Sequence, residues 1–246
     1  MSAFLSRRGL ALLSLTTLLT GTGCASMSNR SETVERQGNV AAENVHTALL
    51  VRLEARPGQE NELKKFLEGG RSIVQGEPAT VQWFALRFGP TTFGIFDTFA
   101  DEPGRQAHLQ GQVAAALGAR APELLAQPPS IEKVDVLATK APAASGAPDV
   151  HEGIVALLEA RPGQEDELRK FLEGALPTVR EEPETTHWYA IRLSPTKFGI
   201  VDTFAAESGR QAHLNGRVAA ALMARASELL AQPPSIEKVQ VLAAKP

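Results

Sequence analysis

The chain has 246 residues, of which 43% are hydrophobic and 22% charged, and its formal net charge is −3. This composition is ordinary for a globular protein with a buried core, and the length allows one large domain or two small ones. Acidic and basic residues are interspersed, so no basic stripe indicates a nucleic-acid partner. The single cysteine, Cys24, excludes an intrachain disulfide and a metal site built from clustered cysteines.

Residues 1–23 have the pattern of an export signal. Arg7 and Arg8 precede an apolar run over residues 10–19, which is too short to span a bilayer. Small residues and then Cys24 follow. This arrangement resembles a bacterial lipoprotein signal, in which the cysteine is lipidated, and the paired arginines weakly resemble a twin-arginine export motif.

Two alternatives remain open at this end of the chain. Gly21 stands where lipoprotein signals usually have leucine, so cleavage near Ala25 without lipidation is the alternative to a lipid on Cys24. Residues 25–44 are polar and show no apolar periodicity, which predicts a flexible tether. We expect an exported protein, anchored by its lipid on the periplasmic side of a bacterial envelope, with the outer membrane favoured.

The rest of the chain is an internal duplication. Residues 45–140 and 150–245 align without a gap, at an offset of 105 residues, and are identical at roughly two-thirds of positions. Residues 141–149, rich in proline, alanine and glycine, predict a short linker. We therefore expect two domains, residues 45–140 and 150–246.

Each repeat predicts four strands and two helices. In the first repeat the apolar run 47–54 predicts a strand, and leucines at helical spacing predict a helix over residues 60–73. Residues 83–99 predict two strands joined at Gly89-Pro90. A second helix is expected over residues 101–127, broken near Gly111 and Gly118, followed by a strand over residues 131–138.

The order βαββαβ is that of the ferredoxin-like fold, an α+β class in which two helices cover one face of a four-stranded antiparallel sheet. The other sheet face also needs a cover. The sister sheet of the second repeat supplies one, so we expect the two repeats to form an intrachain pseudo-dimeric α/β barrel. Strand alternation places Phe84, Leu86 and Phe88 on one face as core. The mixed face with Trp83 and Arg87 suits a pocket or a domain seam.

Three repeated phrases resemble the antibiotic biosynthesis monooxygenase (ABM) family of the dimeric α/β-barrel superfamily, here in a tandem form. They are Glu-Ala-Arg-Pro-Gly-Gln-Glu at residues 54–60, Asp-Thr-Phe-Ala at 97–100 and Gly-Arg-Gln-Ala-His-Leu at 104–109, with copies 105 residues on. The resemblance implies that a quinol or anthrone-like phenol reacts directly with dioxygen, without metal or flavin. Other members of the family have no established activity.

The candidate site residues come in pairs from the two repeats. Trp83 or Trp188 would stack a planar substrate, or would serve only as a large core residue. Arg87 or Arg192 would stabilise an oxyanion, or would pair with Asp97 or Asp202 on the adjacent strand.

The resemblance places a cavity-lining histidine where His108 and His213 stand. Either would act as general base, with Asp97 or Asp202 orienting it, or would be a surface or capping residue. Tyr189, the only tyrosine, and His187 make the second repeat the favoured catalytic copy.

No cofactor is expected. His46 and His151 match across the repeats and are expected to be exposed, and His187 is matched by Gln82, so the histidines show no spacing typical of a metal site. Haem-degrading relatives carry a tryptophan on the second helix, which is missing here.

The sequence thus favours cofactor-independent oxidation of a quinol or polyphenol by dioxygen. The alternative is a non-catalytic envelope lipoprotein module that binds a small hydrophobic ligand or a partner protein. The expected partners are a small aromatic substrate with dioxygen and a membrane reached through the lipid, with no nucleic acid and with further oligomerisation left open.

Overall fold

The computed structural model describes residues 44–142 and 148–246. The predicted signal, Cys24, all but the last residue of the tether and the middle of the linker lie outside these residues. Within the described part of the chain, no helix has the length and apolar character needed to cross a membrane.

The two repeats contain the same elements in the same order. The first repeat consists of β1 (Thr47–Glu54), α2 (Glu60–Val74), β2 (Thr80–Arg87), β3 (Thr92–Phe99), α3 (Glu102–Leu109), α4 (Gln112–Leu124) and β4 (Ser130–Lys140). The second consists of β5 (Glu152–Glu159), α5 (Glu165–Arg180), β6 (Thr185–Arg192), β7 (Lys197–Phe204), α6 (Glu207–Leu214), α7 (Arg217–Leu229) and β8 (Ser235–Lys245).

The second predicted helix is two helices, and it breaks at one of the two expected glycines. The Asp101 side chain caps α3 by accepting a hydrogen bond from the Gly104 N–H, 2.8 Å away. The chain turns at Gly111 and α4 begins there. The expected break at Gly118 is wrong, because α4 runs through this residue to Leu124. A single glycine inside a helix costs only about 1 kcal/mol relative to alanine, which the packing of the helix can offset.

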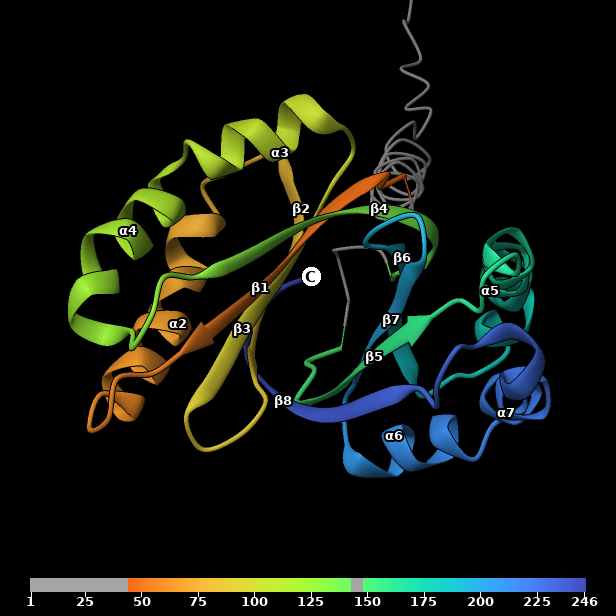
Figure 1. Ribbon diagram of the computed structural model, residues 1–246. Helices are drawn as coiled ribbons and strands as arrows, with labels where there is room; N and C mark the ends of the chain where they lie inside the picture. The colour runs from red at the N-terminus through yellow and green to blue at the C-terminus, as the bar shows by residue number, and fades with distance from the viewer. Residues whose placement is uncertain (1–43, 143–147) are drawn as a thin grey trace, which may run out of the picture.

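All eight strands join one closed antiparallel barrel in the order β1-β3-β2-β8-β5-β7-β6-β4. Its closure depends on the two long strands β4 and β8. The first half of β4 pairs with β1 of its own repeat, and the second half pairs with β6 of the other repeat. The strand β8 pairs in the same way with β5 and β2. Figure 1 shows β4 and β8 crossing between the two halves of the molecule.

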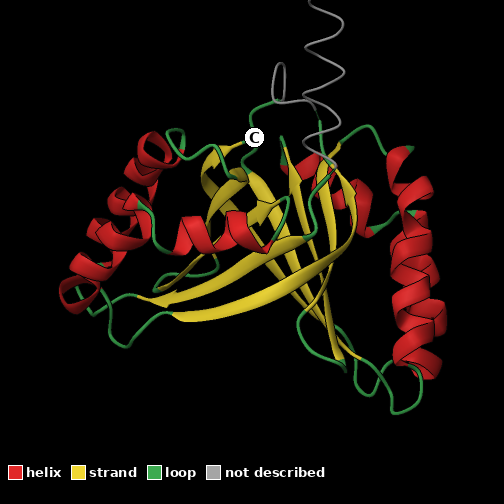
Figure 2. Cartoon of the chain, turned by 90° about the horizontal axis from the view of Figure 1, so that it is seen from above, coloured by secondary structure: helices red, strands yellow, loops and turns green. Residues whose placement is uncertain are grey.

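The barrel separates three hydrophobic cores. One lies inside the barrel, and the other two lie between the outer face of each half-barrel and the helices of that repeat. Figure 2 shows the strands between two flanking groups of helices. The predicted pseudo-dimeric barrel of two ferredoxin-like repeats is therefore confirmed. Phe84 and Leu86 are buried inside the barrel and Phe88 packs against that core, as alternation predicts.

The barrel interior contains an aromatic cluster from both repeats. The ring of Tyr189 lies 5.0 Å from that of Phe96 and 6.4 Å from that of Phe84, measured between centroids. His187 lies 5.0 Å from Phe84 and its Nδ1 is 2.7 Å from the Thr203 hydroxyl. Burial lowers the pKa of His187 to about 3, so this imidazole is neutral at physiological pH.

Replacing Tyr189 with Phe should raise the free energy of unfolding by about 1 kcal/mol. The Tyr189 hydroxyl is fully buried and has no hydrogen-bond partner among the described residues. The first repeat has Phe84 at the matching position. Denaturant unfolding checks this, and a loss of stability would show that the hydroxyl makes a favourable contact.

Candidate functional site

A pocket in the first repeat lies between the outer face of the barrel and the helices. We call it the helix-side pocket. Its cavity has a volume of about 50 Å³. Apolar side chains form most of its wall, and Trp83, Asp97 and His108 add polar groups. Its members come from β1, α2, β2, β3, α3, α4 and β4: Leu49, Val51, Phe66, Leu67, Gly70, Trp83, Ile95, Asp97, His108, Leu109, Val113, Ala114, Leu117 and Ile131.

His108 lies between two carboxylates. Its Nε2 is 3.0 Å from Asp97 Oδ2, and its Nδ1 is 2.7 Å from Glu77 Oε2. The side chains of Asp97 and His108 are 1% and 6% exposed. The Nδ1–Glu77 contact is a hydrogen bond, and the Nε2–Asp97 contact is an ion pair when the ring is protonated, so the arrangement favours an imidazolium or a proton shared with one of the acids. His108 therefore forms the centre of a buried ionic triad with Asp97 and Glu77.

Local structure fixes this triad. Asp97 points to the helix side from β3, His108 ends the buried face of α3, and Glu77 precedes β2. Glu77 also accepts hydrogen bonds from the Thr80 hydroxyl at 3.2 Å and from the backbone N–H of Val113 at 3.3 Å. A Cβ at Gly111 would lie 2.6 Å from Glu77 Oε1, so only glycine lets this carboxylate approach the start of α4.

Burial and charge act in opposite directions on these groups. Burial works against the charge on His108, but the hydrogen bonds and charges of Asp97 and Glu77 outweigh it and raise the pKa of His108. Burial raises the pKa of Asp97 above its ordinary value, although His108 opposes the change. The Asp97–His108 pair therefore retains a proton to a higher pH than a free aspartate would.

The second repeat builds the same triad. His213 Nδ1 lies 2.6 Å from Glu182 Oε2, and Nε2 lies 3.4 Å from Asp202 Oδ2. Burial raises the pKa of Asp202 to about 7. The buried Trp188 Nε1 and Asp202 Oδ1 have no hydrogen-bond partner among the described residues, and the same is true of Trp83 Nε1. Each repeat thus has a buried indole N–H beside its triad that lacks a hydrogen-bond partner among the described residues.

A lysine from the opposite repeat supports each triad. Lys245 at the end of β8 donates to the backbone carbonyls of Val74 and Glu77, at 3.2 and 2.8 Å. Lys140 at the end of β4 donates in the same way to the carbonyls of Val179 and Glu182. The backbone of each triad glutamate is therefore held by the other half of the chain, so the two sites depend on the closed barrel.

The two arginines predicted for the site lie elsewhere. Arg87 donates from Nε to the Gly89 carbonyl at 3.0 Å, and Arg192 donates to the Ser194 carbonyl at 3.1 Å. Arg87 does not line the helix-side pocket, and it forms no ion pair with Asp97. Of the two alternatives left open for Arg87, the ion pair with Asp97 is therefore wrong, since Asp97 pairs with His108 and Arg87 folds back over its own hairpin turn.

Tyr189 and His187 are also outside the predicted site. Both point into the barrel, whereas Trp188 between them points to the helices. Burial raises the pKa of Tyr189 well above its ordinary value, so its hydroxyl stays neutral. His46 and His151 are exposed, as expected. The structure thus brings Trp83, Asp97 and His108 together and places Tyr189 and His187 on the other face of the sheet.

Sequence reasoning missed Glu77 and Glu182. Each precedes a proline just before the second strand of its repeat, and the two positions match at the 105-residue offset. A matched acidic residue in a polar loop was the available signal. In the described part of the chain, no three His, Cys, Asp or Glu side chains are grouped as ligands for one metal ion, and the two nitrogens of His108 face in different directions.

The fold and site define a pseudo-dimeric, ferredoxin-like barrel with a helix-side triad in each repeat. FN1347 from Fusobacterium nucleatum, provisionally named a monooxygenase, is 16% identical and superposes with a TM-score of 0.72 over 81% of this chain and 94% of that one. An anthrone oxidase-like protein is 12% identical, with a TM-score of 0.55 over 83% and 94%.

One match is closer in sequence and shorter. NE2512 from Nitrosomonas europaea, a protein of unknown function, is 58% identical over 41% of this chain and 98% of its own, with a TM-score of 0.41. No protein-family model matches the sequence. No curated protein matches it either.

Proposed function

We propose that this protein is a cofactor-independent oxygenase of the ABM type, which oxidises a quinol, polyphenol or anthrone-like phenol with dioxygen at its helix-side triads. One observation carries the proposal. The Asp97–His108 pair, with its raised pKa values, lies in an apolar pocket beside the free indole N–H of Trp83. A buried base with a raised pKa is suited to removing a phenolic proton near neutral pH.

We assign the base role to the aspartate rather than to the histidine. Both nitrogens of His108 already face carboxylates, so Asp97 is the proton acceptor and His108 is a positioning residue that compensates its charge. The phenolate then gives an electron to dioxygen, the two radicals combine at a ring carbon, and the resulting peroxide anion takes back the proton held by Asp97. At an anthrone-type carbon, loss of water from the hydroperoxide leaves the ketone and accounts for both oxygen atoms.

Substrate entry requires side chains to move. A cavity of about 50 Å³ holds one or two water-sized molecules and is smaller than a phenolic ring. Phe66 and Leu117 are only half-buried, and Ile131 is 48% exposed, so the wall opens on this side. We therefore infer that the ring enters between α2, α4 and β4 and displaces these three side chains.

Oxygen uptake tests the proposed function. The purified protein, freed of metal and flavin by chelation and dialysis, is given a panel of quinols, polyphenols and anthrones in an oxygen electrode. Turnover of at least one class, with the ketone or quinone as product, is expected. No uptake above the buffer control across the panel would contradict catalysis and would favour the binding module that the sequence left as the alternative.

The activity should rise with pH through about 7. The base must be deprotonated to act, and the pKa of Asp202 is raised to about 7, so the rate falls as the pH drops below this value. The Asp97→Asn variant restricts the reaction to the second repeat. The kcat/KM of this variant is then measured from pH 5 to 9. A flat profile over this range would match an ordinary aspartate and would contradict the assignment.

We also propose that the protein is exported and anchored by a lipid on Cys24, on the evidence of the signal-like pattern in residues 1–24. Mass spectrometry of the mature N-terminus should show a lipid-modified cysteine as the first residue. Cys24→Ala should release the protein from the membrane fraction. A mature chain that begins after Cys24 would overturn the anchor.

A further inference from the structure

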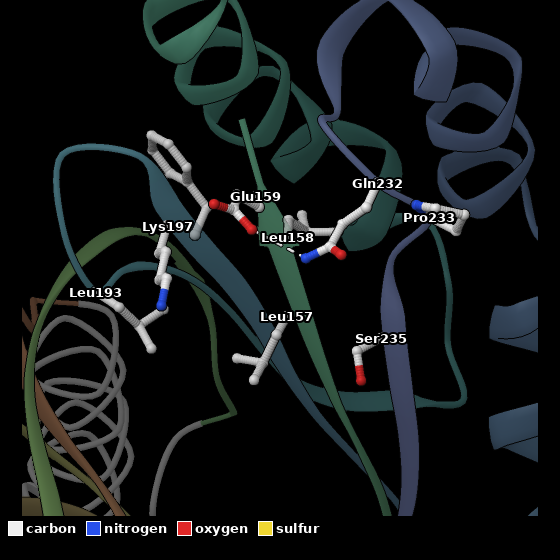
Figure 3. Close-up of a pocket in the computed structure, with 9 residues that line it drawn as sticks. Leu157, Leu158, Glu159, Leu193, Lys197, Gln232, Pro233 and Ser235 are labelled. Carbon is white, nitrogen blue, oxygen red and sulfur yellow. Dashed lines mark hydrogen bonds between the residues drawn. The ribbon is translucent and has the colours of Figure 1, made fainter. Parts of the chain in front are cut away.

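A second pocket opens at one mouth of the barrel, in the second repeat. We call it the mouth pocket. Its cavity of about 290 Å³ lies between the end of β5, the β6–β7 turn and the start of β8. Figure 3 shows Leu157, Leu193, Lys197, Gln232 and Ser235 around it. The size is at the lower end of the range for small-molecule pockets, about 300–1,000 Å³. It shares no lining residue with the helix-side pocket.

The duplication explains why the space is open here. In the first repeat, Arg52 and Phe88 stand where the second has Leu157 and Leu193. The Arg52 guanidinium lies 3.8 Å from the centroid of the Phe88 ring and pairs with Glu237 across the barrel. The second repeat has two smaller leucines at these positions, and they line the open cavity.

The mouth pocket combines apolar walls with one lysine, Lys197, which stands opposite Glu159 on the β5–β7 ladder. Leu157, Leu193 and the buried Phe198 line it. The ammonium of Lys197 has no hydrogen-bond or ion-pair partner among the described residues. The nearby Glu159 accepts a hydrogen bond from the Gln232 amide at 2.9 Å. In the first repeat Thr92 stands at the position of Lys197, and its hydroxyl donates to Glu54 at 2.9 Å. The first repeat therefore has no lysine at the matching position.

We propose that the mouth pocket binds a small amphipathic monocarboxylate, with its apolar chain between Leu157 and Leu193 and its carboxylate on Lys197. The apolar wall gives affinity through burial, and the ammonium selects an anionic end group. The site is separate from the triads and does not depend on the proposed oxygenase activity.

Titration calorimetry with the full chain tests this, with octanoate as the probe and octylammonium as its cationic counterpart. Octanoate should bind with a stoichiometry of one, at least tenfold more tightly than octylammonium. Lys197→Gln should weaken octanoate about tenfold and remove the preference between the two probes. Leu157→Arg with Leu193→Phe, which copies the first repeat, should abolish binding.

Two controls keep the result specific. Lys170→Gln removes an exposed lysine of α5 that pairs with Glu167, and it should leave octanoate affinity unchanged. Asp97→Asn with Asp202→Asn disables the triads and should also leave it unchanged. If a thermal melt shows that the Leu157→Arg, Leu193→Phe variant does not fold, the Lys197→Gln variant decides the test. The Lys197 side chain is exposed, so its replacement should not affect folding. The proposal would be overturned if octanoate did not bind at millimolar concentration, or if its affinity did not change in the Lys197→Gln variant.

Discussion

Asp97→Asn combined with Asp202→Asn should lower phenol-dependent oxygen uptake at least 100-fold. Asparagine keeps the shape of the side chain but cannot accept the phenolic proton, and general-base catalysis contributes about 10²–10⁴ in rate. Each single variant should retain the activity of the other repeat, since both repeats contain the same three triad side chains. Initial rates of oxygen consumption at pH 8 measure the effect.

Asp101→Asn is the matched control. Asp101 lies four residues from Asp97 on the chain and caps α3 from outside the helix-side pocket. Asparagine caps helices as well as aspartate does, so this variant should keep full activity. A double variant at Asp97 and Asp202 within threefold of the wild-type rate, with an unchanged melting temperature, would exclude the aspartates as bases.

Arg105→Met should lower the free energy of unfolding by about 3 kcal/mol. The Arg105 guanidinium is buried and donates to two backbone carbonyls, Ala48 at 3.1 Å and Val134 at 3.0 Å, which belong to the paired strands β1 and β4. Methionine fills the space of the side-chain stem but leaves both carbonyls without this donor. Arg210→Met should have a similar effect, since Arg210 donates to Gly153 and Val239.

Arg120→Met is the comparison for this stability measurement. Arg120 is half-buried at the surface and pairs with Glu123 three residues further along α4, and such surface pairs contribute at most about 1 kcal/mol. Denaturant unfolding should separate the two variants clearly. A change below about 1 kcal/mol for Arg105→Met would mean that water replaces its hydrogen bonds.

The duplication made the fold predictable. An ungapped repeat fixed the element order twice, and the need to cover a second sheet face led to the barrel. The sequence did not show that β4 and β8 extend beyond their own repeat to pair with β6 and β2. Those pairings join residues far apart in the chain, and no local pattern encodes them.

The site was predictable in part. Strand alternation separates Trp188 from His187 and Tyr189, so placing all three in one pocket conflicted with the same rule that placed Phe84 in the core. Arg87 was harder, because it shares the face of Trp83 but lies at the strand end, where its side chain reaches the turn carbonyls. Glu77 enters from a loop, and only the three-dimensional fold brings it to His108.

A crystal structure with a slowly reacting phenol, grown without oxygen, tests the central claim most directly. We predict the ring in the helix-side pocket, in contact with Trp83, with Phe66, Leu117 and Ile131 displaced and the phenolic oxygen within hydrogen-bond distance of Asp97. A ring bound elsewhere, with the Asp97–His108 pair untouched, would contradict the proposed site.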